Sequence, residues 1–151
     1  MAATLSSEGG APASGGGHRG RFFLLVRADV DRRLAGAGAM GAVGYGVAER
    51  LALFAGGLLW PAGGLDVPGV SLGLTADALD GALRPFATIE AQGYFHSGAH
   101  LGAHAALGVG YDIGRHAGAF VEAGVEYTSS TIVAGERALF FVPSAGLLLR
   151  L

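Results

Sequence analysis

The sequence predicts an all-β protein, an eight-stranded antiparallel up-and-down β-barrel. Apolar residues recur at every second position through eight stretches of about ten residues, the period of a strand with one apolar face. Clusters of turn-forming residues separate these stretches. The two longest runs without a charge or histidine, 34–48 and 51–65, hold 15 residues each. A helix needs roughly 20 apolar residues to cross a membrane, so the apolar character points to strands.

The first four stretches are 21–31, 39–48, 50–60 and 69–79. The first and fourth alternate clearly, because every second residue is apolar and Arg, Asp, Ser or Thr stand between. The second and third are nearly apolar on both faces. Their length and their bounding turns still favour strands over helices, since five glycines in one run disfavour a helix interior.

The last four stretches are 85–96, 100–112, 118–128 and 138–151. In the seventh, AFVEAGVEY, the alternating residues are Ala, Val, Ala, Val and Tyr, and two glutamates lie on the other face. The eighth contains Pro143, which cannot donate to a β-ladder. We therefore expect the last regular strand to begin near Pro143 or to bulge there.

Two segments make up the predicted organisation. Residues 1–20 are rich in Gly, Ser and Ala and contain no apolar core of a signal peptide, so we expect a disordered tail. Residues 21–151 form one barrel domain. Its connections AER, DGALR and GRHA are short, whereas those around 31–38, 60–68 and 129–137 are expected to be longer.

The composition decides which face of the sheet is outside. Taking every second residue gives 43 positions without a single charged residue, His, Ser, Thr, Asn or Gln. An eight-stranded interior is only just wide enough to fill with side chains, and the chain contains no Lys to cover a soluble surface. We therefore expect the apolar face to meet lipid, which makes the fold a transmembrane β-barrel. A soluble lipocalin-like binding barrel, with the apolar face inside, is the alternative.

Aromatic residues at strand ends support this orientation. Tyr45, Tyr111 and Tyr127 stand on the apolar face near the ends of their stretches, where an aromatic girdle belongs. We expect Trp60 to be an interfacial anchor. With an even number of strands, the short turns fall on one side, expected to be periplasmic, and the longer connections fall on the other.

The last strand, FFVPSAGLLLRL, carries a more specific pattern. Leu147, Leu149 and Leu151 occupy alternating places up to the C-terminus. In this pattern the chain resembles the small eight-stranded outer-membrane proteins of Gram-negative bacteria, such as the OmpA transmembrane domain, OmpX and OmpW. The resemblance implies an outer-membrane location, contact with outer-membrane lipid and recognition of this strand by the barrel-assembly machinery. That family ends on an aromatic residue, whereas this chain ends on Leu151.

Charged residues on the polar face are the candidate functional site. Within the span these are Arg27, Asp29, Asp77, Glu90, Glu122 and Glu126, with Arg50 and Arg150 near the periplasmic end. Buried charges must pair or remain hydrated. We expect a network that plugs the lumen, as the resemblance to OmpA implies. Because acids outnumber Arg five to one in the middle, a narrow porin-like channel for small cations or solutes is the alternative.

Two other motifs give only weak indications of a metal or cofactor site. His100 and His104 lie about 13 Å apart on a strand and cannot share an ion, and His96 and His100 are expected to be loop-edge residues, so we expect no metal. Residues 36–41 match GxGxxG, but the following segment is strand-like rather than helical, and no cofactor is expected.

The sequence also argues against several classes of function. The segment FHSG at 95–98 does not match the HxSN-like motif of lipid A deacylases, so neither a lipid-modifying activity nor catalytic residues are expected. Net charge −2 disfavours nucleic-acid binding. The segments 60–69 and 129–137 are short and weakly polar, so their composition does not support receptor binding. We expect a monomer with a structural role in the cell envelope.

Overall fold

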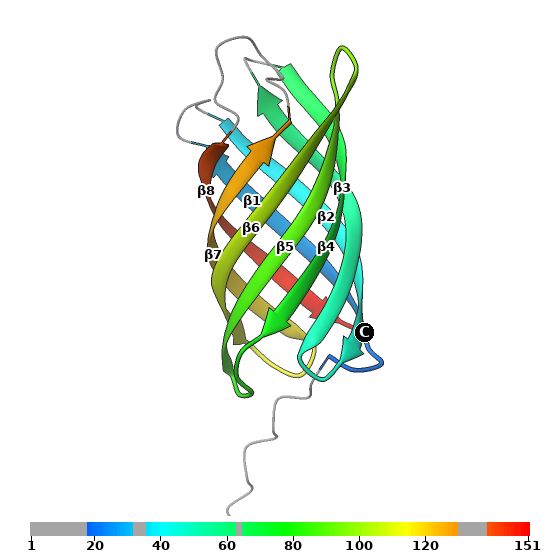
Figure 1. Ribbon diagram of the computed structural model, residues 1–151. Helices are drawn as coiled ribbons and strands as arrows, with labels where there is room; N and C mark the ends of the chain where they lie inside the picture. The colour runs from blue at the N-terminus through cyan, green and yellow to red at the C-terminus, as the bar shows by residue number, and fades with distance from the viewer. Residues whose placement is uncertain (1–17, 32–35, 63–64, 130–138) are drawn as a thin grey trace, which may run out of the picture.

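The computed structural model is a closed barrel of eight antiparallel strands, each paired with its neighbours in chain order and β1 paired with β8 (Figure 1). It describes residues 18–31, 36–62, 65–129 and 139–151. None of these described residues forms a helix long and apolar enough to cross a membrane. The strands are β1 (Phe22–Asp31), β2 (Gly36–Ala48), β3 (Leu51–Ala62), β4 (Leu65–Asp77), β5 (Leu83–Phe95), β6 (Ala99–Asp112), β7 (Ala117–Thr128) and β8 (Leu139–Arg150).

The two ends of the barrel differ in what they hold. One end, here called the turn end, contains the β2–β3, β4–β5 and β6–β7 turns together with the beginning of β1 and the C-terminus (Figure 1). The other, the loop end, contains the remaining four connections. Two of the expected longer connections are shorter in the structure, because β2 begins at Gly36 and the β3–β4 hairpin continues to Ala62 and Leu65. The expectation of longer connections there is wrong, since strand pairing continues past the predicted ends.

Side chains alternate between the two faces as predicted. Where the structure describes the side chains of the strands, the outward positions are apolar, Gly or Pro, and most of their large side chains are exposed, with Leu107 at 72% and Leu72 at 62%. The described charged and polar residues of the strands point inward, and most of them are buried. Tyr45, Tyr111 and Tyr127 are exposed on the outer face near strand ends, the first two at the turn end and the third at the loop end.

Part of the interior is filled by aromatic side chains that lie on glycines of the neighbouring strand. The Cβ of an alanine at Gly44 would lie 2.0 Å from Cζ of Phe23, its cross-strand partner. The same relationship holds for three further cross-strand pairs: Phe54 on Gly73, Phe86 on Gly108, and Phe120 on Gly146. Glycine is required at these positions because the ring occupies the space of a side chain, so ring and glycine fit together like a large and a small core residue.

Two sequence predictions about single residues are wrong. Trp60 is 4% exposed and lies inside the barrel against Gly38 and Phe140, so it is not an interfacial anchor. Both faces of β3 are apolar, so the sequence pattern does not show that the side chain of Trp60 points inward. Pro143 lies within β8, paired with Ala123 without a shift in register. The ladder between β8 and β1 ends at Ser144, so the missing N–H of Pro143 falls just beyond that ladder.

The predicted tail also differs at its last residues. His18 is buried and Arg19 forms a bridge with Gly46, so residues 18–20 pack against the barrel. The rest of the predicted tail, 1–17, lies outside the described residues.

Candidate functional site: a charge network inside the barrel

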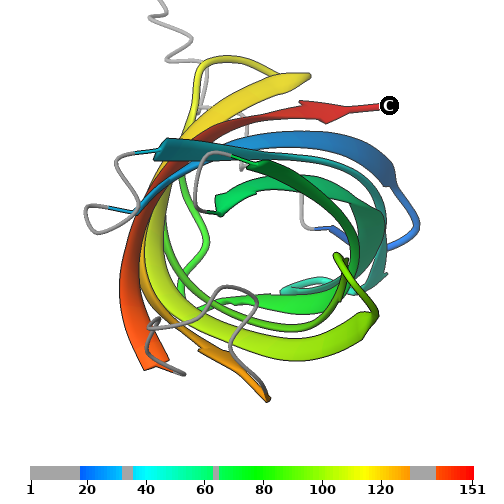
Figure 2. The same ribbon diagram turned by 90° about the horizontal axis from the view of Figure 1, so that it is seen from above.

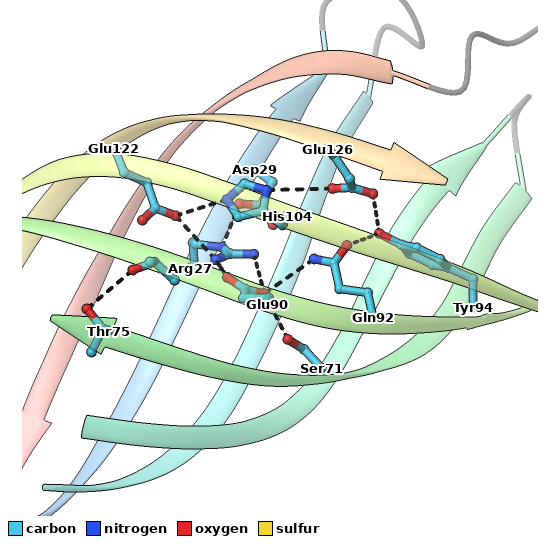
Figure 3. A network of polar contacts seen from close by, with 11 residues as sticks. Arg27, Asp29, Ser71, Thr75, Glu90, Gln92, Tyr94, His104, Glu122 and Glu126 are labelled. Carbon is cyan, nitrogen blue, oxygen red and sulfur yellow. Dashed lines mark hydrogen bonds and ion pairs between the residues drawn. The ribbon is translucent and has the colours of Figure 1, made fainter. Parts of the chain in front are cut away.

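Arg27 is the centre of a polar network in the middle of the barrel (Figure 3). It projects inward from β1 because it shares the inward parity of Phe23 and Asp29. Its Nη1 donates to Glu90 Oε1 and, at 3.2 Å, to Glu122 Oε1. Its Nη2 lies 3.3 Å from Glu90 Oε2, and its Nε lies 2.8 Å from Asp29 Oδ1. One guanidinium therefore binds carboxylates from three strands.

The bond between Arg27 and Glu90 crosses the lumen. Strands β1 and β5 are four places apart in a closed ring of eight, so they face each other across the barrel axis (Figure 2). A side chain from each wall reaches the middle, where the two ends meet in a paired guanidinium–carboxylate contact. This pairing is the strongest kind of side-chain hydrogen bonding.

The network continues toward the loop end through neutral groups. Glu90 Oε2 accepts from Ser71 Oγ at 2.8 Å and from Gln92 Nε2 at 3.3 Å. The Tyr94 hydroxyl lies 2.8 Å from Gln92 Oε1 and also contacts a carboxylate oxygen of Glu126 (Figure 3). All of these side chains are buried, so the contacts hold them in one arrangement.

His104 lies between two carboxylates. Its Nε2 is 3.9 Å from Glu122 Oε1 and its Nδ1 is 3.9 Å from Glu126 Oε2, distances too long for direct hydrogen bonds. The ring lies over Gly124, where an added Cβ would be 2.6 Å from Cε1. Among the described residues, no group of three or more His, Asp or Glu side chains is arranged to hold a metal ion.

Asp77 is separated from this network, although its position in the sequence predicts a place among the same charges. Its Oδ2 lies 2.8 Å from His18 Nε2 and accepts from Arg84 Nη1 at 3.0 Å. Arg84 Nη2 donates to Asp112 Oδ1 at 2.8 Å, and Arg150 donates to the same oxygen. These five residues form a second network, here called the turn-end network.

Arg50 lies outside the lumen, contrary to the expectation of an interior charge. Its side chain is 51% exposed, and its guanidinium binds Asp80 between two turns. The hydrogen bond from Arg50 holds the pKa of the Asp80 carboxyl below its ordinary value. Of the remaining histidines, His100 Nε2 contacts the backbone oxygen of His96 at 2.8 Å, so both stay at the β5–β6 turn.

A cavity of about 60 Å³ separates the two networks. Its walls include the four phenylalanines that lie on glycines, and Leu25 and Leu148 add further apolar surface. Arg27 and Glu122 line it from the central network, and His18, Asp77 and Arg84 line it from the turn-end network. The lumen thus contains an apolar chamber between two polar layers.

Several residues of both networks were missed by sequence reasoning. Tyr94 shares the parity of Glu90 and Gln92, so alternation could have placed it inside. Arg84 and Asp112 stand at strand ends beside turns, where parity is hard to assign. His18 has no signal in the sequence, because it precedes the first strand in a Gly-rich segment.

The comparisons with known proteins agree with this architecture. A structure from the de novo design of transmembrane β-barrels superposes with a TM-score of 0.62 at 17% identity, covering 90% of this chain and 99% of that chain. The N-terminal β-barrel domain of Pseudomonas aeruginosa OprF superposes with a TM-score of 0.67 at 12% identity, covering 88% and 98%. No protein-family model and no curated protein sequence matches the chain.

The fold is that of a transmembrane β-barrel. The prediction of an eight-stranded antiparallel up-and-down barrel is confirmed, as is the resemblance to outer-membrane barrels of the OmpA type at the level of the fold. In such a membrane barrel, the exposed apolar side chains of the outer face contact lipid, and only the interior and the two ends are available for polar chemistry.

Proposed function

We propose that this chain is a structural barrel of the bacterial outer membrane whose lumen is closed by its own side chains. The contact between Arg27 and Glu90 carries the proposal, because it joins opposite walls of the barrel. Glu122 and Asp29 bind the same guanidinium, so a single rotamer change of Glu90 does not free it. Arg27 is 3% exposed, in keeping with a closed lumen.

The outer face supports a structural role rather than catalysis on lipid. A nucleophile needs a base within hydrogen-bond reach, and the outward strand positions whose side chains the structure describes offer no Ser, His or acid. The polar groups of the interior are separated from lipid by the barrel wall. We therefore assign no enzymatic activity to the chain.

Planar-bilayer recording tests the closed lumen. Refolded protein is inserted into a bilayer, and insertion is verified by protection of the barrel from protease in matched vesicles. We expect no unitary conductance in the wild type. Steady ion currents from verified single insertions would overturn the proposal.

A cation channel is the second candidate, and the charge balance of the lumen favours it. The central network contains one guanidinium and four carboxyl groups, those of Asp29, Glu90, Glu122 and Glu126. A lining of this sign attracts cations. If the wild type conducts, this candidate requires cation selectivity in a salt gradient, and it requires that Glu122→Gln or Glu126→Gln reduce that selectivity. Equal passage of anions would exclude it.

We further propose that the turn end faces the periplasm and that the assembly machinery recognises Leu147, Leu149 and Leu151. All three are exposed on the outer face or at the C-terminus of β8, where a partner can contact them during insertion. Membrane fractionation tests the location: the chain should co-sediment with outer-membrane markers, whereas recovery with the inner membrane would contradict it.

A further inference from the structure

The segment before β1 enters the mouth of the barrel at the turn end. The backbone N–H of His18 donates to the oxygen of Glu49 at 2.8 Å, and that of Gly20 donates to the oxygen of Gly46 at 2.8 Å. Arg19 and Gly20 are exposed, yet the His18 residue is only 6% exposed. The backbone therefore runs along the rim while the imidazole points into the barrel.

The imidazole is held on both sides. Its Nε2 lies 2.8 Å from Asp77 Oδ2, and the ring centroid is 6.1 Å from that of Phe23. Asp77 is fixed in turn by Arg84 at 3.0 Å. His18 also lines the apolar cavity between the two networks, so it forms part of the cavity's wall at the turn end.

A glycine allows this close approach. An alanine Cβ at Gly46 would lie 1.6 Å from the backbone oxygen of His18 and 2.1 Å from its carbonyl carbon. These contacts involve backbone atoms, which cannot move aside as a flexible side chain could. The residue at position 46 must therefore be glycine for the segment to lie in this place.

We propose that His18–Gly20 is a plug for the turn-end mouth, held by the pair between His18 and Asp77. When the plug is released, the cavity opens to the solution at the turn end and admits water and small neutral molecules. The central network around Arg27 lies beyond the cavity and remains closed. The plug is thus a second seal, independent of whether the central network blocks ions.

The absence of cysteine in the chain permits a direct test. The full-length variant Thr88→Cys places a thiol at a buried position that lines the cavity. The rate of its alkylation by iodoacetamide, a small neutral reagent, is followed by mass spectrometry on protein refolded in micelles. We expect slow alkylation in this background and an increase of about tenfold or more with His18→Ala, the effect of losing one hydrogen bond to a charged group.

A second variant opens the plug without touching its side chain. Gly46→Ala should accelerate alkylation of Cys at position 88 in the same way, because the added methyl group displaces the backbone of His18. Gly41→Ala is its control on the same strand, since nothing lies within 4 Å of a Cβ at Gly41. His116→Ala is the control for His18→Ala, because His116 is an exposed histidine at the same end.

A deeper reporter separates release of the plug from loosening of the whole barrel. Ser144→Cys is nearly isosteric, is buried, does not line the cavity and removes no hydrogen bond of the described structure. With His18→Ala, this reporter should stay slow while the reporter at position 88 becomes fast. Unchanged rates at position 88 in both opening variants would overturn the proposal, as would equal acceleration at positions 88 and 144. Bilayer conductance of the wild type bears only on the proposed function.

Discussion

Arg27 on β1 and Glu90 on β5 bind each other across the full width of the barrel. The two residues are 63 positions apart in the chain, and each is held by further partners on its own side of the lumen. A buried charge that loses its partner is costly, since the remaining charge is neither paired nor hydrated. Loss of these contacts should therefore destabilise the fold and, if the lumen is closed as we propose, open it as well.

A double-mutant cycle tests this pairing. Arg27→Met and Glu90→Met should each lower the free energy of unfolding, Arg27→Met by roughly 3–5 kcal/mol because three carboxyl groups, those of Asp29, Glu90 and Glu122, lose their common partner. The double variant should lose less than the sum of the single losses, with a coupling of about 0.5–3 kcal/mol. Urea unfolding in micelles supplies the free energies. Strict additivity would mean that the two side chains do not interact.

Gly44→Ala tests the packing of the Phe23 ring against a glycine. The new methyl group would meet the Phe23 ring, so the ring must move, and overpacking of this kind costs about 1–3 kcal/mol. Gly41→Ala on the same strand meets nothing within 4 Å and should be close to neutral. The unfolding free energies of both variants decide the matter, and equal effects would refute the packing argument.

Leu107→Arg tests the outward face. Leu107 is 72% exposed in the middle of β6, and an arginine facing lipid near the bilayer midplane costs roughly 2–4 kcal/mol. Tyr111→Arg, near the strand end, should cost about 0–1 kcal/mol. The measurement is the free energy of unfolding from phospholipid vesicles. A soluble barrel would tolerate both substitutions equally.

Leu151→Phe tests recognition of the last strand. Leu151 is 72% exposed, and its backbone N–H donates to the oxygen of Phe22 at 2.9 Å, so an aromatic side chain can be accommodated without disturbing that bond. We expect a larger folded fraction in the outer membrane of cells, judged by protease resistance of isolated membranes. Refolding in detergent, where no assembly machinery acts, should be unchanged. A gain in detergent too would indicate a change in stability instead.

Asp80→Asn tests the pair at the turn end. Because the pKa of Asp80 is lowered in the folded chain by Arg50, the pair stabilises the fold above the ordinary carboxyl pKa. That contribution disappears as the pH falls through the lowered value. Both groups are exposed to solvent, so the effect on the unfolding midpoint should be small at neutral pH and absent in strong acid. A large effect that persists in acid would contradict this explanation.

Alternation could reveal the faces of the barrel because parity alone decides where a strand residue points. Parity was enough for Arg27, Glu90 and Glu122, whose faces are chemically distinct. It was not enough for Trp60, since both faces of β3 are apolar and the pattern carries no contrast there. Gly38 and Gly44 of β2 are explained only by the rings of Trp60 and Phe23 on the neighbouring strands.

Distances along the barrel axis could not be derived from the sequence. Asp77 has the same inward parity as the central charges, but it stands at the end of its strand, and strand register places it beside Arg84 and His18. Register depends on pairing between strands, which single-strand patterns do not encode. For the same reason the contact between His18 and Asp77, 59 positions apart, could not be foreseen.

The most direct test of the membrane barrel is an SDS gel of detergent-refolded protein, boiled and unboiled, with circular dichroism of the same sample. We expect a β-rich spectrum and faster migration of the unboiled band, because a closed barrel with a lipid-facing apolar surface resists SDS until it is heated. Folding in buffer without detergent, with one band position in both lanes, would contradict the assignment of the apolar face to lipid.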